Sequence, residues 1–152
     1  MVNSTLCYIE KDGKYLMLHR VKKENDVNKE KWIGIGGKFE DKESPEECIL
    51  RETKEETGLT LNSIKLRAVV TFTSKQYETD YMYLFTSDDF SGEIIECNEG
   101  NLEWIDKEEL IKLNIWEGDK IFLNKIKENC PFFTLKLEYD GDKLVNYNLT
   151  EY

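Results

Sequence analysis

The sequence predicts an α/β domain in which a mixed β-sheet is flanked by helices. Short runs that alternate apolar and polar residues, separated by glycine-containing turns, are typical of strands. A strongly capped helix interrupts these runs in the middle of the chain, and a second helical pattern comes late. Strands and helices in this order favour a sheet that buries its apolar faces under helices. With 152 residues, the chain is expected to form one domain, 1–152, with its own core.

The amino-terminal segment is expected to form a β-hairpin. Residues 6–10 and 14–20 alternate as strands do, and they flank Asp12 and Gly13. Asp-Gly is a strong turn signal because both residue types accept the positive φ that a tight hairpin needs. The polar and charged segment 21–31 then reads as a loop.

Residues 32–37, Trp-Ile-Gly-Ile-Gly-Gly, predict a strand of unusual composition. Glycine inside a strand often marks a place where another group comes close to the backbone. We expect Gly36 and Gly37 to let the backbone approach phosphate oxygens of a substrate.

The central helix is predicted from its two ends. Ser44 followed by Glu47 forms the pattern of a capping box, and Pro45 suits the first helical position, where no N–H is needed. Gly58 stands where a helix commonly ends in a left-handed residue. These signals predict a helix between residues 45 and 57.

The second half of the chain predicts further strands and two helices. Ile121, Phe122 and Ile126 recur at helical spacing, which predicts a helix over 117–127 with an apolar face in the core. Asp-Gly-Asp at 140–142 indicates a second hairpin turn. The remaining expected elements are strands at 64–73, 81–86, 101–105, 132–139 and 144–149, and a helix at 107–113.

Three carboxylates crowd one face of the central helix. Glu52, Glu55 and Glu56 stand at i, i+3 and i+4, so their side chains share a face. Like charges this close repel, and a helix that only needed to be soluble would alternate its signs. A divalent cation would compensate them, so the sequence predicts a metal site. Mg²⁺ is the expected ion because it takes oxygen ligands, usually one or two carboxylates together with substrate phosphates, and Mn²⁺ is the alternative.

The amino-acid composition limits the classes of molecule that the protein is expected to bind. The net charge of −10 argues against a nucleic-acid polymer, because such binding needs Lys and Arg to neutralise phosphates. A small phosphorylated substrate is compatible, since a bound metal supplies local positive charge. No run is apolar and long enough to span a membrane, and the first residues do not resemble a signal peptide. Four scattered cysteines without a Cys-x-x-Cys pair favour a cytoplasmic protein. A monomer or a homodimer is expected, and the sequence does not decide between them.

The segment 37–59 resembles the signature of the Nudix hydrolases. That signature is Gly, five residues, Glu, seven residues, Arg-Glu, an apolar residue, any residue, Glu-Glu, any residue, Gly and an apolar residue. Only Thr53 departs from it, at an apolar position where its methyl group can still pack. The resemblance implies the Nudix α/β/α sandwich and metal-dependent hydrolysis of a nucleoside diphosphate linked to another group. The matching residues are Gly37, Glu43, Arg51, Glu52, Glu55, Glu56, Gly58 and Leu59.

The resemblance also implies roles within the metal site. Glu52 and Glu56 would be the principal metal ligands, and one of them, which the sequence does not decide, would act as the base. Arg51 would pair with Glu43 and orient the catalytic carboxylates. Further metal ligands would be Glu55, the carbonyl of Gly36, and Glu99 five residues before Trp104.

Several features outside this segment resemble one branch of the family, which hydrolyses oxidised purine dNTPs, such as 8-oxo-dGTP, to the monophosphate and pyrophosphate. These features are the chain length, the run from Trp32 to Lys38, Trp116 followed by Asp119, and the aromatic hairpin at the end of the chain. By that resemblance, Trp116 would stack on the base and Asp119 would hydrogen-bond its edge. Two departures concern the same pocket: Ile33 stands where the branch often has Asn, and Gly118 replaces one acid of an Asp pair. The other substrate-binding residues implied are Thr5, Val27, Gly37 and Lys38.

Other functions are weighed against this one. Tyr77 lies near the position of a tyrosine in dinucleoside polyphosphate hydrolases, which makes these the main alternative. The proline that ADP-ribose pyrophosphatases carry shortly after the signature is missing. A nucleotide-sensing module without catalysis is a third reading, and the complete set of Glu52, Glu55 and Glu56 argues against it.

Overall fold

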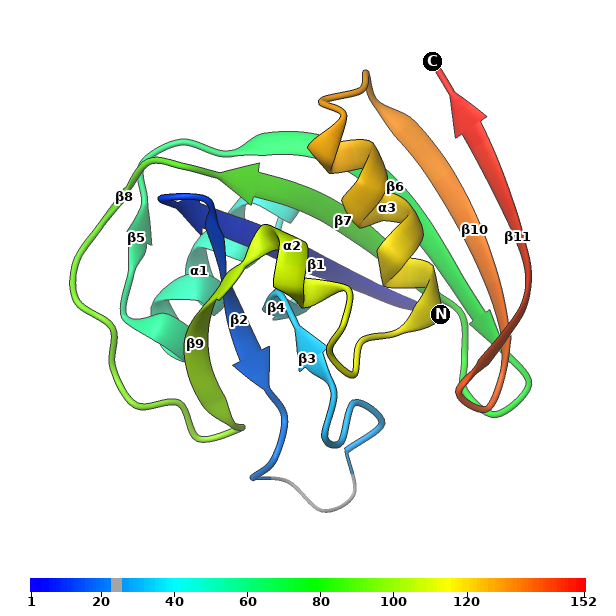
Figure 1. Ribbon diagram of the computed structural model, residues 1–152, viewed down its shortest axis with the longest axis horizontal. Coiled ribbons are helices and arrows are strands. Elements are labelled where there is room, and N and C mark those ends of the chain that lie inside the picture. Colours follow the sequence, from blue (N-terminus) through cyan, green and yellow to red (C-terminus); the bar gives the residue numbers. More distant parts are fainter. Residues whose placement is uncertain (23–25) are drawn as a thin grey trace.

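The fold is a sheet with helices on both faces, as the sequence predicts. The computed structural model describes residues 1–22 and 26–152, and Figure 1 shows how the elements are arranged. In chain order these are β1 (Val2–Lys11), β2 (Lys14–His19), β3 (Trp32–Ile33), β4 (Ile35–Lys38), α1 (Pro45–Thr57), β5 (Thr60–Leu61), β6 (Lys65–Ser74), β7 (Asp80–Ser87), β8 (Phe90–Ser91), β9 (Asn101–Asp106), α2 (Lys107–Leu110), α3 (Glu117–Lys127), β10 (Phe133–Asp140) and β11 (Lys143–Glu151).

Nine strands of the described chain join one sheet. Its order is β11-β10-β6-β7-β1-β2-β3, with β4 paired to β1 and β9 paired to β2. β1 runs parallel to β7, and β6 runs parallel to β10, whereas the other pairs in this sheet are antiparallel. The prediction of a mixed sheet is therefore confirmed.

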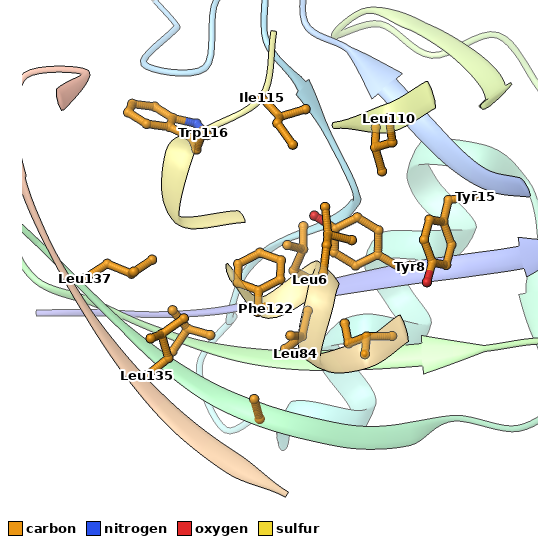
Figure 2. Packing of buried hydrophobic residues seen from close by; sticks show 14 of the residues in the cluster. Leu6, Tyr8, Tyr15, Leu84, Leu110, Ile115, Trp116, Phe122, Leu135 and Leu137 are labelled. Carbon is orange, nitrogen blue, oxygen red and sulfur yellow. The ribbon is translucent and has the colours of Figure 1, made fainter. Parts of the chain in front are cut away.

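Helices α1 and α3 lie on opposite sides of this sheet, with α3 in front and α1 behind in Figure 1. β1 shows the alternation that two covered faces require. Leu6 and Tyr8 join the core cluster that contains α3 residues, whereas Cys7 and Ile9 join the cluster beside α1. Figure 2 shows the first cluster around Phe122 of α3, whose ring centroid is 5.9 Å from that of Tyr8. The layers are those of an α/β/α sandwich.

Helix α1 has the predicted ends. The Glu47 N–H donates to Ser44 Oγ at 3.1 Å, and the Ser44 N–H donates back to Glu47 Oε1 at 2.9 Å. Pro45 begins the helix, and Gly58 ends it with a φ of 82°. The side of α1 that meets the sheet is buried and includes one acid, Glu56.

The two predicted hairpins form as expected. Asp12 and Gly13 have φ values of 54° and 77°, the conformation of a tight turn that suits the twist of β1 and β2. In the second hairpin Asp140 pairs with Lys143, and Gly141 has a φ of 60°. This hairpin forms the outer edge of the sheet beyond β6 (Figure 1).

Helix α2 is shorter than the predicted 107–113. Its chain tightens after Leu110, because the N–H groups of Lys112 and Leu113 donate to residues three positions earlier. None of the helices in the described part of the chain is long and apolar enough to cross a membrane.

The segment 32–37 forms two strands rather than one. β3 pairs with β2, and β4 pairs with β1, so the chain changes partner at Gly34. A Cβ at Gly34 would come within 2.9 Å of the Cys7 carbonyl oxygen, which explains why a glycine stands there. The short pair β5–β8 was not predicted, because two-residue strands carry too little alternation to be detected.

The predicted loop 21–31 contains no helix or strand in its described part, and residues 23–25 lie outside the described residues. Backbone hydrogen bonds close it at its ends: the Arg20 N–H donates to the Lys31 carbonyl at 3.0 Å, and the Glu30 N–H donates to the Arg20 carbonyl at 2.6 Å. The loop therefore delivers Arg20 and Lys31 to the body of the domain.

Candidate active site

Glu52 and Glu56 meet strand β4 at its glycines. The Gly36 N–H donates to Glu56 Oε1 at 3.2 Å. A Cβ on Gly37 would lie only 2.4 Å from Cδ of Glu52, so the missing side chain makes room for that carboxyl group. Helical spacing on α1 places the two acids one turn apart, and β4 holds both from the other side.

Arg51 binds a set of carboxylates beside this pair. Its guanidinium meets Glu43 in a two-point contact, Nε to Oε2 at 2.6 Å and Nη2 to Oε1 at 2.9 Å. Nη1 donates to Glu52 Oε1 at 2.9 Å and to Glu55 Oε2 at 3.1 Å. Glu40 also lies 3.1 Å from Nε. The predicted pairing of Arg51 with Glu43 and a helix-face acid is present, and one cation orients several carboxylates at once.

These contacts shift the pKa values in opposite directions. The hydrogen bond from Arg51 lowers the pKa of Glu43 to about 2. Burial, followed by the charges of Glu52 and Glu99, raises the pKa of Glu56 to about 9. Burial also raises the pKa of Glu52, against the opposing effect of Arg51. The negative charge of Glu43 is therefore stabilised by Arg51, whereas a negative charge on Glu56 would lack a compensating partner.

The donors fit a divalent cation of the Mg²⁺ type. Glu56 Oε2 is buried and has no hydrogen-bond partner among the described residues. Such an oxygen is a rare and costly feature unless something binds it. The described residues do not form a ready-made group of three or more His, Cys, Asp or Glu in metal-binding geometry, and Glu55 contacts Arg51 at 3.1 Å. One or two carboxylates are enough for Mg²⁺ when substrate phosphates and water complete its shell.

Glu99 lies close to this site, whereas Glu96 does not. The charge of Glu99 contributes to the raised pKa of Glu56, and its Oε2 lies 3.1 Å from Nη1 of Arg20. The Glu99 side chain is 30% exposed, whereas that of Glu96 is 89% exposed and meets Lys22 at 3.5 Å. The structure therefore brings Glu99, and not Glu96, close to the helix acids.

At Gly36 and Gly37 the atoms that come close to the backbone belong to the protein itself, whereas the sequence led us to expect phosphate oxygens of a substrate. A Cβ on Gly36 would come within 1.9 Å of the Thr5 carbonyl oxygen, and that on Gly37 would strike Glu52. Lys38 is exposed, its carbonyl accepts from Arg51 at 3.1 Å, and its charge acts on Asp80. Contact of Gly36, Gly37 and Lys38 with a metal or phosphate stays a prediction.

A second cluster surrounds Trp116 and Asp119 at the start of α3. Trp116 is 6% exposed, and its ring meets Phe72 and Tyr139 edge to face at 5.8 and 5.2 Å. Its Nε1 donates to Asn28 Oδ1 at 2.7 Å. Asp119 is 8% exposed, and burial raises its pKa to about 8 against the opposing charge of a lysine. The two residues lie in the first turn of α3, where the Asp119 N–H donates to the Trp116 carbonyl at 3.0 Å, and a buried carboxyl group and an indole are both suited to binding a planar polar ligand.

The structure explains one departure from the family pattern in this cluster. A Cβ on Gly118 would come within 2.5 Å of Leu137 Cδ1 and 2.8 Å of the Tyr139 hydroxyl. The Gly118 N–H donates to that hydroxyl at 2.7 Å. An acid at this position would have to displace these two buried side chains. Ile33, the other departure, is half-buried and packs against both core clusters.

The structure does not bring Thr5 to this cluster. In β1 it lies on the face toward α1, where its hydroxyl is 3.3 Å from Cys48 Sγ and 3.4 Å from the Gly37 carbonyl. A one-residue step along a strand changes the face, so the expected position depended on a register that spacing alone does not supply. Val27 is 44% exposed and precedes Asn28, the partner of Trp116.

Two residues in these clusters were missed by the sequence analysis. Arg20 joins Asp26, at 2.6 Å, to Glu99. Lys31 places its Nζ 4.6 Å from the centroid of the Trp116 ring and is itself 8% exposed. Both belong to or border a charged segment that reads as solvated, and the only available signal was the rarity of arginine.

Comparisons with known proteins agree with this geometry. A family model described as the NUDIX domain matches residues 2–126. An uncharacterized Nudix hydrolase, YvcI, of Bacillus subtilis is 31% identical over 120 residues, which cover 76% of this chain and 72% of that protein. The oxidized purine nucleoside triphosphate hydrolase of Danio rerio is 28% identical over 123 residues, 80% of this chain and 78% of that one. The crystal structure of a mutator MutT protein from Bacillus halodurans superposes with a TM-score of 0.87 at 25% identity, over 98% of this chain and 97% of that one. The chain therefore belongs to the Nudix family of hydrolases.

Proposed function

We propose that this protein is a metal-dependent nucleoside triphosphate pyrophosphohydrolase that acts on oxidised purine dNTPs of the 8-oxo-dGTP type. The observation that carries the proposal is the pair Glu52 and Glu56 on the glycines of β4, with one buried oxygen of Glu56 left without a partner. An acid in that position is useful to an enzyme that binds a cation there, and it is a burden to a protein that does not.

In the proposed reaction, water attacks phosphorus, the bond to the departing pyrophosphate breaks, and the monophosphate remains. A bound Mg²⁺ or Mn²⁺ would neutralise phosphate charge and activate the water. Glu52 and Glu56 would hold that ion, and one of them would take the proton from the water. Arg51 fixes Glu52 through a 2.9 Å hydrogen bond, which keeps the carboxylate aimed at β4. Glu99 would reach the same ion when it leaves Arg20.

The nucleotide part of the proposal rests on Trp116 and Asp119. An indole supplies a stacking surface for any base, and a buried acid discriminates between base edges because a mismatched edge leaves it unpaired. Relatives from Danio rerio and Mus musculus carry the name oxidized purine nucleoside triphosphate hydrolase, at 28% and 26% identity. The enclosed position of both residues supports the assignment of this cluster to the base.

The main alternative is a hydrolase of dinucleoside polyphosphates. Tyr77, on which that reading depends, is 56% exposed in the turn between β6 and β7. Turnover of 8-oxo-dGTP, dGTP, 2-hydroxy-dATP and diadenosine tetraphosphate, each with Mg²⁺ and with Mn²⁺, separates the possibilities. We expect pyrophosphate release from 8-oxo-dGTP with the highest kcat/KM. Cleavage of diadenosine tetraphosphate alone would assign the protein to the alternative, and binding without turnover would identify a sensor.

A further inference from the structure

Lys31 covers one face of Trp116 with an ammonium group that is poorly satisfied. Its side chain is 10% exposed, and its Nζ lies 4.6 Å from the ring centroid. The other contacts of Nζ to described residues are long: 3.4 Å to Asn114 Oδ1 and 3.8 Å to Asp142 Oδ2. A lysine ammonium has three N–H donors. At least one of them therefore points into this nearly buried space without a hydrogen-bond partner of its own.

Asp119 is the matching unsatisfied acid. It is 8% exposed, and no hydrogen bond joins its carboxyl group to any residue that the structure describes. Its electrostatic partner is Lys31, yet no ion pair joins the two within the described chain. A donor above the Trp116 ring and an acceptor three residues further along the chain thus lie in one region and remain apart. Buried groups of this kind are normally paired, so the arrangement indicates a ligand that satisfies both.

This space also has an entrance. Asp142, which lies 3.8 Å from the ammonium, is 80% exposed. It lines an open hollow of about 490 Å³ together with Glu117, Lys143 and Leu144, between the start of α3 and the β10–β11 hairpin. Lys31 therefore contacts a residue that lines this open hollow at the edge of the Trp116 cluster.

We infer that Lys31 is a specificity-determining residue of the nucleotide site: its ammonium leaves the face of Trp116 when a base binds there and donates a hydrogen bond to a carbonyl oxygen of that base. Asp119 then accepts from the N–H beside the carbonyl. The ligand class is a base with a lactam edge, in which a C=O and an N–H are adjacent. Guanine and hypoxanthine carry this edge in both normal and oxidised forms.

Adenine offers the opposite pattern at the same edge. Its amino group would direct donors toward the ammonium of Lys31, and its ring nitrogen would direct a lone pair toward the carboxylate of Asp119. Both protein groups would lose water without gaining a partner, and such a mismatch discriminates strongly. The inference rests on the proposed nucleotide site, and it adds the residue and the base edge that would set the preference.

The test uses dIMP and dAMP, which differ at this edge and cannot be hydrolysed by the proposed reaction. Dissociation constants are measured by calorimetry just above pH 8, where the Asp119 carboxyl group is ionised, for the wild-type protein, Lys31→Met, Lys31→Arg and Lys29→Met. We expect the wild-type protein to bind dIMP at least about tenfold more tightly than dAMP, the scale of one hydrogen bond to a charged group. Lys31→Met should remove most of that ratio by weakening dIMP. Lys31→Arg keeps a donor and should retain the preference.

Lys29→Met is the matched control, because Lys29 is an exposed lysine of the same segment. It should leave both constants unchanged. Equal binding of dIMP and dAMP by the wild-type protein would overturn the inference, whether or not any variant folds. So would an equal loss for both nucleotides in Lys31→Met, which indicates a structural role. Failure to hydrolyse any triphosphate would refute the proposed reaction and leave this binding ratio as a separate result.

Discussion

The carboxyl group of Glu52 lies where a side chain on Gly37 would begin, with 2.4 Å between Glu52 Cδ and the Cβ position of Gly37. The glycine is thus part of the catalytic geometry, because it lets the strand approach the acid. The contacted atoms of Glu52 are at the end of a flexible side chain, so the carboxyl group can move away from an added methyl group without a shift of the backbone.

Gly37→Ala should therefore fold and lose catalysis. We expect kcat to fall by about a hundredfold, the effect of misplacing a catalytic group by about an ångström. Gly13→Ala is the contrasting control: its φ of 77° disfavours alanine, but nothing lies within 4 Å of its Cβ position. That variant should lose about 1 kcal/mol of stability and keep its rate. Unchanged kcat in a folded Gly37→Ala protein would show that Glu52 is not placed by this contact.

Replacing either Glu52 or Glu56 by its amide should separate folding from activity. Glu52→Gln and Glu56→Gln keep the side-chain shape, so both should fold, while kcat falls by at least about a hundredfold. The rise in Tm on adding Mg²⁺ should also shrink in both, since a ligand stabilises only in proportion to its binding. Glu46→Gln, at an exposed acid of the same helix, is the control. Wild-type turnover in both test variants would refute the assignment of the metal site to α1.

Glu99 is expected to act as a metal ligand that Glu96 cannot replace. Glu99→Gln should raise the Mg²⁺ concentration needed for half-maximal activity several-fold, because a carboxylate near Glu56 is lost. Glu96→Gln removes a charge of the same segment whose side chain is 89% exposed, and it should change little. Metal titrations of the two variants that superimpose would remove Glu99 from the proposed ligands.

The parts of the site that sequence could predict are those determined within a few residues. The capping box of Ser44 and Glu47 and the left-handed Gly58 fix the ends of α1, and 3.6-residue periodicity then puts Glu52 and Glu56 on one side. The pairing of Arg51 with Glu43 was expected from the resemblance to the Nudix signature, and the two residues lie only eight positions apart.

The remaining parts depend on contacts between distant segments. The face on which Thr5 lies is set by the register of β1 against β4 and β7, and a one-residue error reverses it. Lys31 meets Trp116 because a loop closed by backbone hydrogen bonds carries it across the domain. No periodicity in the sequence records such a contact.

The last prediction concerns the pH dependence of stability at Asp119. Burial raises the pKa of its carboxyl group to about 8 in the folded chain, although Lys31 opposes the shift, and the ordinary value is 3.8. Between about pH 4 and 8 the folded chain thus holds a proton that the unfolded chain has released. Stability contributed by this group must fall as pH rises through that window, by at most about 1.4 kcal/mol per pH unit. The charge of Asp119 in turn helps to raise the pKa values of Tyr8 and Tyr139, for which burial is the main cause.

Asp119→Asn removes the titration and keeps the shape. Without nucleotide, its free energy of unfolding in urea should therefore rise relative to the wild-type protein at each step from pH 5 to 8, and the difference should level off above pH 8. Asp88→Asn, at an exposed aspartate, should show no such trend. A constant difference between Asp119→Asn and wild type across the window would mean that Asp119 is ionised throughout, paired more closely with Lys31 than the structure shows. Just above pH 8, where the wild-type carboxyl group is ionised, the same variant should also lose the preference for a lactam base, because it places no carboxylate beside the ring N–H.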